Sequence, residues 1–444
     1  MPGTAPPSGM RDFLPEDVRR REHAIGIIKR VYERYGFEPL ETPAAENLET
    51  LLGRYGDEGN KLIFKILRRG EHEATGQADL ALRYDLTVPL ARVVAQYQAQ
   101  LPRPFRRYQI QPVWRADRPG RGRFREFYQC DIDALGSTSP VVEAELCGAV
   151  ADALGELGFA DFAIRINHRE LLTSLLRAAG VAEDAHGAAM VALDKLDKIG
   201  GDGVARELAE RGVGTEARET LLVFFAAAPD VDQELARLGA LVTDERGAAA
   251  VENLRAIGAL AASTSAAGRL RIDPSLARGL DYYTGAIMEI NVADLPGSLG
   301  AGGRYDNLVG MFSGQPIPAC GFSLGLERIL VVMGERGMFP ASLASAPADV
   351  LVATFDAAGA GPAMRLADRL RGAGLRVMVY PDPGKIGRQI KYADSRGIPY
   401  VAILGEDEIK AGSVTMKHLA TQTQDTYDQA AAAAAILERL PARG

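Results

Sequence analysis

The sequence predicts an α+β protein that has a domain with a mostly antiparallel sheet, a helical insertion in that domain, and a compact α/β module at the carboxyl end. Three observations lead to this prediction. At 444 residues the chain is too long for one typical core. Residues from about 170 to 265 show helical periodicity, whereas strand-like patterns lie on both sides of them. Beyond residue 348, strand-like and helical patterns alternate.

The first part of the sheet domain, residues 1–169, begins with a predicted helix over 15–36. That segment has apolar positions at helical spacing, a proline and acids in its first turn, and a glycine where a helix could stop. Residues 37–46 are predicted to be extended and broken by two prolines. Residues 104–136 predict two strands joined by a mobile loop, RADRPGRGRFR, which contains a proline and two glycines.

The helical insertion is predicted over 170–265, where alanine, leucine and charged residues dominate. The second part of the sheet domain, 266–338, has strand-like patterns in YYTGAIMEINVA and PACGFSLGL and a glycine cluster in GSLGAGGRYDNLVG. Residues 339–348 have the proline, serine and alanine content of a linker. The module, 349–444, alternates DVLVATF, AMRLADRLRGAG, LRVMVY, GKIGRQIKYADSRG, PYVAILG and SVTMKHL, and ends in a helix through QAAAAAAILERL.

The composition is ordinary for a globular protein, with 47% hydrophobic and 25% charged residues. No apolar run approaches the roughly 18 residues that span a bilayer, and the first residues lack the layout of a signal peptide. We therefore expect a cytoplasmic protein without a membrane partner. The three cysteines and five histidines are scattered, so we expect neither a disulfide framework nor a metal site.

Positive charge is concentrated between Arg103 and Arg125, where eight arginines accompany one acid, although the net charge of the chain is −7. A solvated basic face is one interpretation. Because these arginines are interleaved with apolar and aromatic residues around a flexible loop, bidentate recognition of phosphates fits better. In the module, Lys385, Arg388 and Lys391 lie on neighbouring turns of a predicted helix, as either a solvated face or a nucleic-acid-binding surface.

Three further arginines, Arg115, Arg278 and Arg328, stand in distinctive settings. Each alone could form a structural ion pair, but together they could bind a nucleoside triphosphate, because a polyanion needs several directional cations. Two carboxylates beside an amide would suit a substrate that carries an ammonium group and a second nitrogen donor. The residues of this second pocket are Asp85, Asp133 and Gln129, with Tyr282 and Tyr283 closing it.

The motifs together resemble those of the histidyl-tRNA synthetases, a family of class II aminoacyl-tRNA synthetases. YGFEPLETP resembles the first class II motif, VWRADRPGRGRFREFYQCDID the second and its loop, and GFSLGLERI the third. ARGLDYYTG and SLGAGGRYDNLV resemble the two histidine-specific signatures. GKIGRQIKYAD and YVAILGEDEI resemble the anticodon-binding domain, so the resemblance covers nearly the whole chain.

The resemblance implies a role for each matching residue. Arg278 would reach the reacting carboxylate and the α-phosphate, and Pro43 would lie at the interface of a homodimer. The residues that match the histidine-binding positions of the family are Asp85, Thr87, Gln129, Asp133, Tyr282 and Tyr283. Those that match ATP-binding positions are Arg115, Arg123, Arg278 and Arg328, of which Arg115 and Arg278 are catalytic. Those expected to contact tRNA are Gly120, Arg121, Lys385, Arg388 and Lys391.

The activity that the resemblance implies has two steps. L-histidine and ATP, which arrives with Mg²⁺, give histidyl-adenylate and pyrophosphate, and the terminal ribose of tRNA(His) then takes the histidine. The carboxylate of the amino acid is the nucleophile, so the protein needs to supply alignment and charge stabilisation rather than a covalent group. We expect no tightly bound cofactor and no editing domain.

The sequence departs from the common bacterial pattern of the family in two places. Asp85 and Asp133 have shorter side chains than the glutamates often found there. Gly120 follows the proline of the loop, where many bacterial members carry glutamine. We therefore expect less dependence on the extra 5′ guanosine of tRNA(His), which equal charging of tRNAs with and without it would support.

Two other classes of protein share this fold. One is a non-catalytic paralogue that acts as the regulatory subunit of ATP phosphoribosyltransferase, and the other is a nucleic-acid-binding or stress-sensing module. Paralogues of the first kind generally lack the C-terminal module and have eroded signatures, whereas both are intact here. The second kind should have lost the ATP-binding arginines, and Arg115, Arg278 and Arg328 argue against it.

Overall fold

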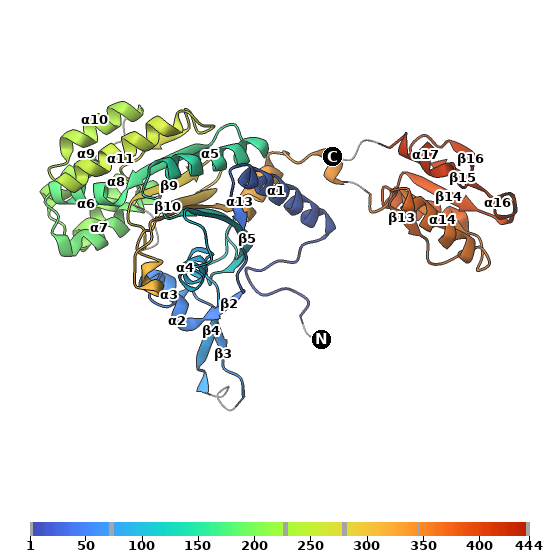
Figure 1. The fold of residues 1–444 in the computed structure, drawn as a ribbon, viewed down its shortest axis with the longest axis horizontal. Coiled ribbons are helices and arrows are strands. Elements are labelled where there is room, and N and C mark those ends of the chain that lie inside the picture. The colour runs from blue at the N-terminus through green and yellow to red at the C-terminus, as the bar shows by residue number, and fades with distance from the viewer. Residues whose placement is uncertain (1–2, 71–74, 225–229, 278–281, 345, 441–444) are drawn as a thin grey trace. The chain divides into compact units, whose positions relative to one another are not determined.

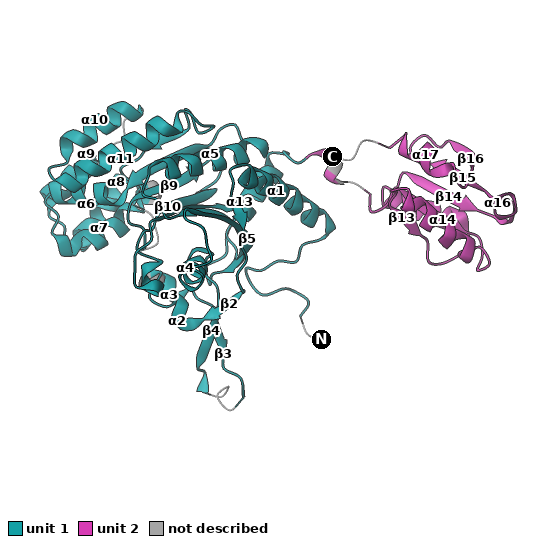
Figure 2. Cartoon of the chain, viewed as in Figure 1, with its two compact units in different colours: residues 1–339 teal, residues 340–444 magenta. Residues whose placement is uncertain are grey.

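The structure is a computed structural model that describes residues 3–70, 75–224, 230–277, 282–344 and 346–440. The chain divides into two compact units, residues 1–339 and residues 340–444, which Figure 2 distinguishes by colour. Each unit has its own sheet and its own hydrophobic core. Among the described residues, no helix is long and apolar enough to cross a membrane.

An eight-stranded sheet forms the centre of the first unit. Every neighbouring pair in it is antiparallel except β1 with β5 and β7 with β8, at its two ends. The mostly antiparallel sheet predicted from the sequence is therefore confirmed. In spatial order its strands are β1 (Glu38–Pro39), β5 (Phe105–Trp114), β6 (Glu126–Leu135), β11 (Ala319–Gly325), β10 (Gly300–Arg304), β9 (Ala286–Asn291), β7 (Ala163–His168) and β8 (Leu270–Ile272).

Three helices cover one face of this sheet, namely α1 (Pro15–Arg34), α5 (Val141–Glu156) and α13 (Leu326–Glu335) (Figure 1). The helix predicted over 15–36 is α1, whose buried residues include Ile27, Ile28, Val31 and Tyr32. These side chains recur at helical spacing, so they form one apolar stripe that packs into the main core. The sheet face under these helices is consequently apolar.

The opposite face carries α4 (Thr87–Gln96), which packs with the ends of β5 and β6 through a second core. A small three-stranded sheet, in the order β2, β4, β3, adjoins it. The sequence predicted no separate elements for residues 48–84. The first strand of this small sheet, β2 (Ala45–Asn47), lies at the end of the segment that was predicted to be extended. Residues 48–84 form α2 (Leu48–Leu51), α3 (Gly56–Lys61), β3 (Lys65–Leu67) and β4 (Ala78–Leu82), and later in the chain α12 (Gly310–Ser313) contacts α4.

Between β7 and β8 the described residues form helices only, and Figure 1 shows these helices gathered at one side of the first unit. The longest of them packs against α5 and α6, which joins the helical layer to the main core. Two of them begin at an aspartate, Asp230 or Asp244, whose side chain accepts from a backbone N–H three residues on. The helices are α6 (Arg169–Ala178), η2 (Glu183–Ala185), α7 (His186–Leu193), α8 (Leu196–Glu210), α9 (Thr215–Phe224), α10 (Val231–Leu241) and α11 (Glu245–Ala261).

The second unit has a five-stranded sheet in the order β13, β12, β14, β15, β16. The first three strands are parallel and the last two pair antiparallel. The predicted alternation of strands and helices is confirmed, but α16 and β16 were not predicted. The elements are η3 (Ala341–Ala344), β12 (Val350–Thr354), α14 (Ala360–Gly372), β13 (Val377–Val379), α15 (Ile386–Ser395), β14 (Tyr400–Leu404), α16 (Glu406–Ala411), β15 (Ser413–His418), β16 (Gln424–Asp428) and α17 (Ala432–Leu437).

Candidate active site

The face of the large sheet that lies opposite α1, α5 and α13 carries a row of polar side chains. Side chains alternate along a strand, so Gln129, Asp131 and Asp133 of β6 lie on one face, while Cys130 and Ile132 enter the core on the other. The strand register places other polar or small residues beside these three. They are Gln111, Gln109 and Arg107 of β5, and Gly325, Ser323 and Gly321 of β11.

Glycines on β10 and β11 make room for this row. An added Cβ at Gly321 would lie 1.9 Å from Asp133 Oδ1, so only glycine leaves that carboxylate its place. An added Cβ at Gly302, on the next strand, would lie 2.3 Å from the carbonyl oxygen of Gly321. The glycine cluster singled out in the sequence therefore permits a close approach of strands under the site.

Asp133 is held from two sides. The Tyr305 hydroxyl donates to Asp133 Oδ1, and Arg107 Nη2 lies 2.8 Å from Asp133 Oδ2. All three side chains are buried. Burial raises the pKa of Asp133, and the Arg107 guanidinium and the Tyr305 hydroxyl both lower it. A carboxylate has about four lone-pair sites, so Asp133 can still accept from a ligand.

Asp131 is a second buried carboxylate on the same strand, and the sequence did not single it out. Arg107 Nη2 lies 4.0 Å from Asp131 Oδ2. Burial raises the pKa of Asp131 to about 7, Arg107 lowers it, and the nearby Asp133 raises it. The two aspartates therefore share one buried guanidinium, and their charges are coupled.

Asp85 lies in the short connection between β4 and α4. Its Oδ1 accepts from the backbone N–H of Val88, in the first turn of α4, at 3.0 Å. Its oxygens also accept from the hydroxyls of Tyr55, at 3.0 Å, and Tyr282, at 3.2 Å. Burial raises the pKa of Asp85, while the Val88 N–H and the charge of Arg115 lower it. The sequence thus placed Asp85 and Tyr282 in one pocket, and the structure brings their side chains into contact.

Aromatic rings form one wall of this pocket. The ring of Tyr282 packs edge-on against Tyr283 and Tyr305, with centroids 5.0 Å and 5.9 Å apart. Burial raises the pKa of Tyr282, and the Thr87 hydroxyl opposes that rise. Tyr283 packs so tightly that an added Cβ at Gly303 would lie 2.9 Å from its ring. The two segments that resemble the histidine-specific signatures, ARGLDYYTG and SLGAGGRYDNLV, therefore contact each other in this wall of the pocket.

The candidate phosphate-binding arginines surround the loop between β5 and β6. Arg115 Nε donates to the carbonyl oxygen of Tyr84 at 3.0 Å, and its guanidinium lies over the Tyr84 ring, 4.3 Å from the centroid. Arg328 Nη1 donates to the carbonyl oxygen of Ser298 at 2.6 Å. An added Cβ at Gly122 would lie 3.2 Å from Arg328 Cγ, so the loop passes close to α13. Arg278, with residues 279–281, lies outside the described residues.

The residues of the loop itself are joined to each other and to α13. Gly120 and Arg123 exchange backbone hydrogen bonds of 3.0 and 2.9 Å, which closes a small hairpin. Arg121 donates to both carboxylate oxygens of Glu335, at the end of α13, and at 3.0 Å to the carbonyl oxygen of Asp294. The Arg123 and Arg121 side chains are exposed.

The other sequence-predicted residues lie on the surface. Pro43 is exposed, and its carbonyl oxygen accepts from Arg83 at 3.2 Å. Arg388 and Lys391 are exposed on α15, and Lys385 is exposed immediately before it, in the second unit. Two of the clustered arginines pair with carboxylates: Arg106 with Glu145 at 2.8 Å, and Arg107, within the polar row, with Asp133 at 2.8 Å. For these two, the interpretation as phosphate ligands is wrong.

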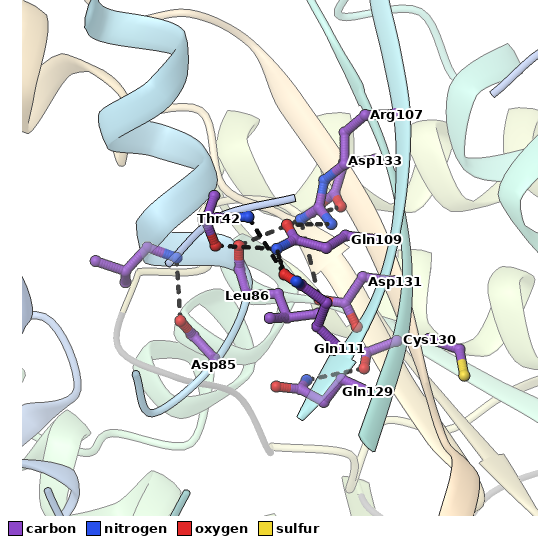
Figure 3. A network of polar contacts seen from close by, with 12 residues as sticks. Thr42, Asp85, Leu86, Arg107, Gln109, Gln111, Gln129, Cys130, Asp131 and Asp133 are labelled. Atoms are coloured by element: carbon purple, nitrogen blue, oxygen red, sulfur yellow. Dashed lines mark hydrogen bonds and ion pairs between the residues drawn. The ribbon is translucent and has the colours of Figure 1, made fainter. Parts of the chain in front are cut away.

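A buried polar network links the segment around Pro43 to the site (Figure 3). Gln109 Nε2 donates to Thr42 Oγ1 at 2.9 Å and to Gln111 Oε1 at 2.6 Å. Arg83 is buried and donates to the carbonyl oxygen of Thr42 at 2.6 Å and to Gln111 Oε1 at 3.0 Å. Sequence reasoning missed these residues, although polar side chains at alternate positions of β5 were a signal for them. The missed residues of the site and its support are Tyr55, Arg83, Arg107, Gln109, Gln111, Asp131, Tyr305 and Ser323.

Comparison with known proteins identifies the family. The family model described as histidyl-tRNA synthetase matches residues 9–329. The chain belongs to the histidyl-tRNA synthetase family. A second model, described as an anticodon binding domain, matches residues 349–439. The predicted family and its class II fold with a C-terminal anticodon-binding domain are therefore confirmed.

Similar histidyl-tRNA synthetase family members extend over nearly the whole chain. The histidine–tRNA ligase of Gloeobacter violaceus is 43% identical over 459 residues, which cover 97% of this chain and 98% of that protein. The histidine–tRNA ligase of Christiangramia forsetii is 41% identical, covering 95% of this chain and 96% of that protein. The crystal structure of histidyl-tRNA synthetase from Nostoc sp. PCC 7120 superposes with a TM-score of 0.80 at 32% identity, covering 99% of this chain and 100% of that one.

One similar structure bears on the alternative function. A Bacillus halodurans protein described as an ATP phosphoribosyltransferase regulatory subunit/histidyl-tRNA synthetase superposes with a TM-score of 0.73 at 22% identity. The match covers 88% of this chain and 96% of that one. At this identity the likeness is one of fold, and it assigns no function.

Proposed function

We propose that this chain is a histidine–tRNA ligase whose amino-acid site lies between the polar row of β6 and the start of α4. The observation that carries the proposal is the convergence of buried acceptor groups there, on Asp85, Gln129 and Asp133. They occur in a chain that is 43% identical to a histidine–tRNA ligase over 97% of its length. The chain accordingly activates histidine with ATP and transfers it to tRNA.

In the proposed site the two ends of histidine are bound by different groups. Asp85, Thr87 and Gln129 receive the α-ammonium, because a carboxylate, a hydroxyl and an amide oxygen are acceptors for its three N–H groups. Asp133 and Tyr283 hold the two nitrogens of the imidazole, and Tyr282 fixes Asp85 through its hydroxyl. A site that pairs both ring nitrogens leaves buried groups unpaired with a wrong side chain, which can give discrimination of about 10⁴–10⁵.

ATP is proposed to lie beside the loop between β5 and β6. Arg115 and Arg278 hold the α-phosphate and stabilise charge that develops there, and Arg123 and Arg328 bind the remainder of the nucleotide. The Arg115 guanidinium is held in position by its hydrogen bond to the Tyr84 carbonyl oxygen and by its stacking on the Tyr84 ring. Mg²⁺ enters with ATP as part of the substrate. The histidine carboxylate attacks the α-phosphorus, pyrophosphate leaves, and the ribose hydroxyl of tRNA then displaces AMP.

The remaining assignments are also proposals. Gly120 and Arg121 of the loop contact the acceptor end of tRNA(His), and Lys385, Arg388 and Lys391 contact its anticodon region through phosphates. The protein acts in the cytoplasm as a homodimer with Pro43 at the interface. Residues 1–169 and 266–338 form the catalytic domain, 170–265 the insertion, 339–348 the linker and 349–444 the anticodon-binding domain.

The test of this proposal is histidine-dependent exchange of pyrophosphate into ATP by the full-length protein, with a panel of other amino acids. We expect exchange with histidine alone, and loss of most of it in Arg278→Ala. Exchange with another amino acid would contradict the assignment of the pocket. Folded protein that gives no exchange with any amino acid would favour the alternative function as a regulatory subunit of ATP phosphoribosyltransferase.

A further inference from the structure

The side-chain amide of Gln129, one of the proposed ligands, can point either of two ways. Its Nε2 donates to Ser323 Oγ at 2.9 Å. Its Oε1 is buried and has no hydrogen-bond partner among the described residues. If the amide were turned over, the Ser323 hydroxyl could donate to Oε1 instead, and an N–H₂ group would face the substrate. An ammonium group of the substrate requires Gln129 Oε1 on the side that faces it, so another residue must determine the orientation of the amide.

Asp131, which lies opposite Ser323, determines which of the two orientations the Gln129 amide adopts. Ser323 of β11 is the register partner of Asp131 of β6, so the two side chains are neighbours on one face of the sheet, and the Ser323 hydroxyl acts to lower the pKa of Asp131. An ionised carboxylate can only accept, so the single proton of Ser323 goes to Asp131. Ser323 Oγ then has only lone pairs left for Gln129. The amide must turn its Nε2 to Ser323 and its Oε1 away from it.

The surroundings of Asp131 bring the pKa of its carboxyl group close to neutral pH. Burial raises its pKa to about 7, and the Arg107 guanidinium and the Ser323 hydroxyl oppose that rise. A protonated Asp131 could donate to Ser323, which would free the Ser323 proton for Gln129 Oε1. The ionisable groups that act on Asp131, or on which it acts, from the elements around it are Tyr32, Arg83, Asp85, Arg107, Cys130, Asp133 and Tyr283.

We propose that Asp131 and Ser323 are positioning residues for histidine binding, which act by holding Gln129 Oε1 toward the α-ammonium of the substrate. The inference rests on the proposed function, because it takes Gln129 as a ligand of that ammonium. It adds a requirement that the ligand positions alone do not contain, namely a directed chain of hydrogen bonds from Gln129 through Ser323 to an ionised Asp131. Neither positioning residue needs to touch the substrate.

The test measures KM for histidine and for ATP by pyrophosphate exchange in the full-length wild type, Ser323→Ala, Ser323→Thr and Asp131→Asn. Loss of one hydrogen bond that orients a charged contact should raise KM for histidine about tenfold in Ser323→Ala. KM for ATP should change less than about twofold, since Gln129 is not an ATP ligand. Ser323→Thr keeps the hydroxyl and should restore KM for histidine.

The pH dependence gives a second readout. KM for histidine in the wild type should rise as the pH falls through about 7, as Asp131 gains its proton. Part of that rise in KM comes from protonation of the imidazole of the substrate, and this part should remain in Asp131→Asn. Asp131→Asn should therefore have a raised KM at pH 8 and a shallower dependence between pH 6 and pH 8.

The outcomes separate the inference from the proposed function. No exchange by the folded wild type would overturn the function. An active wild type whose KM for histidine is unchanged in Ser323→Ala and Asp131→Asn would overturn the inference alone. An equal rise in KM for ATP and histidine would also overturn it, because it would indicate a general distortion of the sheet.

Discussion

At the scale of single residues, the site depends on charges that the sheet buries in pairs. Arg107 lies 2.8 Å from one carboxylate and 4.0 Å from another, and all three side chains are almost completely buried. Removing one partner from such a group leaves an unpaired buried charge, which typically costs about 3–5 kcal/mol. Arg107 therefore supports the site even though it was only one of eight arginines in the sequence.

Asp131 gives this arrangement a pH dependence. Its pKa is raised to about 7 from an ordinary value of 3.8, so between those values the folded protein binds a proton that the unfolded chain does not. Stability from this group is full below about pH 4 and is lost as the pH rises through about 7. In Asp131→Asn that loss should be absent. The difference in thermal unfolding midpoint, variant minus wild type, should therefore be more positive at pH 8 than at pH 5.

A matched substitution checks that prediction. Asp349→Asn removes another buried carboxylate, which pairs with Arg376 at 2.8 Å in the second unit. Its difference in midpoint should not become more positive toward pH 8. A difference for Asp131→Asn that is equal at both pH values would mean that Asp131 ionises in its ordinary range.

At the scale of elements, the two long strands β5 and β6 position most of the site. Their pairing sets Arg107 opposite Asp133 and Gln109 opposite Asp131. The glycines of β10 and β11 then let neighbouring strands approach the row without side chains in the way. The site depends on the pairing register of the strands, because a shift of one residue would move every polar side chain of the row to the face that packs in the apolar core.

Gly321→Ala tests the role of these glycines. The added methyl group would lie 1.9 Å from Asp133 Oδ1, so the carboxylate must leave its place beside Tyr305. We expect a loss of kcat/KM for histidine of about 100-fold or more in pyrophosphate exchange, from displacement of a buried ligand by more than 1 Å. Gly155→Ala, in α5, meets no atom within 4 Å and should keep the wild-type rate. A wild-type rate for Gly321→Ala would show that Asp133 is not needed where it lies.

Elements with a strong sequence pattern were predictable, and those without one were not. The α1 helix and the β5–β6 pair have clear periodicity and turn residues, and both are found where expected. β16 was missed because it is an almost fully exposed edge strand without alternating apolar residues. α16 was missed because it has only six residues. The pairings of Arg107 and of Ser323 were not predictable, since each depends on register between strands far apart in the chain.

At the scale of the whole molecule, the two units divide the proposed work. All the residues proposed for amino-acid activation belong to the first unit, while the anticodon-binding domain matches residues 349–439 of the second. Changes confined to α15 should therefore affect the step that uses tRNA and spare the step that does not.

The triple variant Lys385→Ala, Arg388→Ala, Lys391→Ala tests this division. We expect KM for tRNA(His) in charging to rise at least tenfold at moderate salt, because phosphate contacts are lost, with pyrophosphate exchange unchanged. A triple alanine variant at Arg365, Arg369 and Lys410, which are also exposed in the second unit, removes the same charge elsewhere. Equal losses in the two variants would mean that net charge, rather than α15, determines tRNA binding.

The pocket around Asp85 is proposed to bind histidine, and equilibrium binding of histidine to the full-length protein measures this without ATP or tRNA. Asp85→Asn keeps an acceptor for the Val88 N–H but removes the charge opposite the α-ammonium. Histidine affinity should fall at least tenfold in this variant and stay at the wild-type value in Asp349→Asn, which changes a buried carboxylate of the second unit. Wild-type affinity in a folded Asp85→Asn protein would contradict the account and place the amino acid elsewhere.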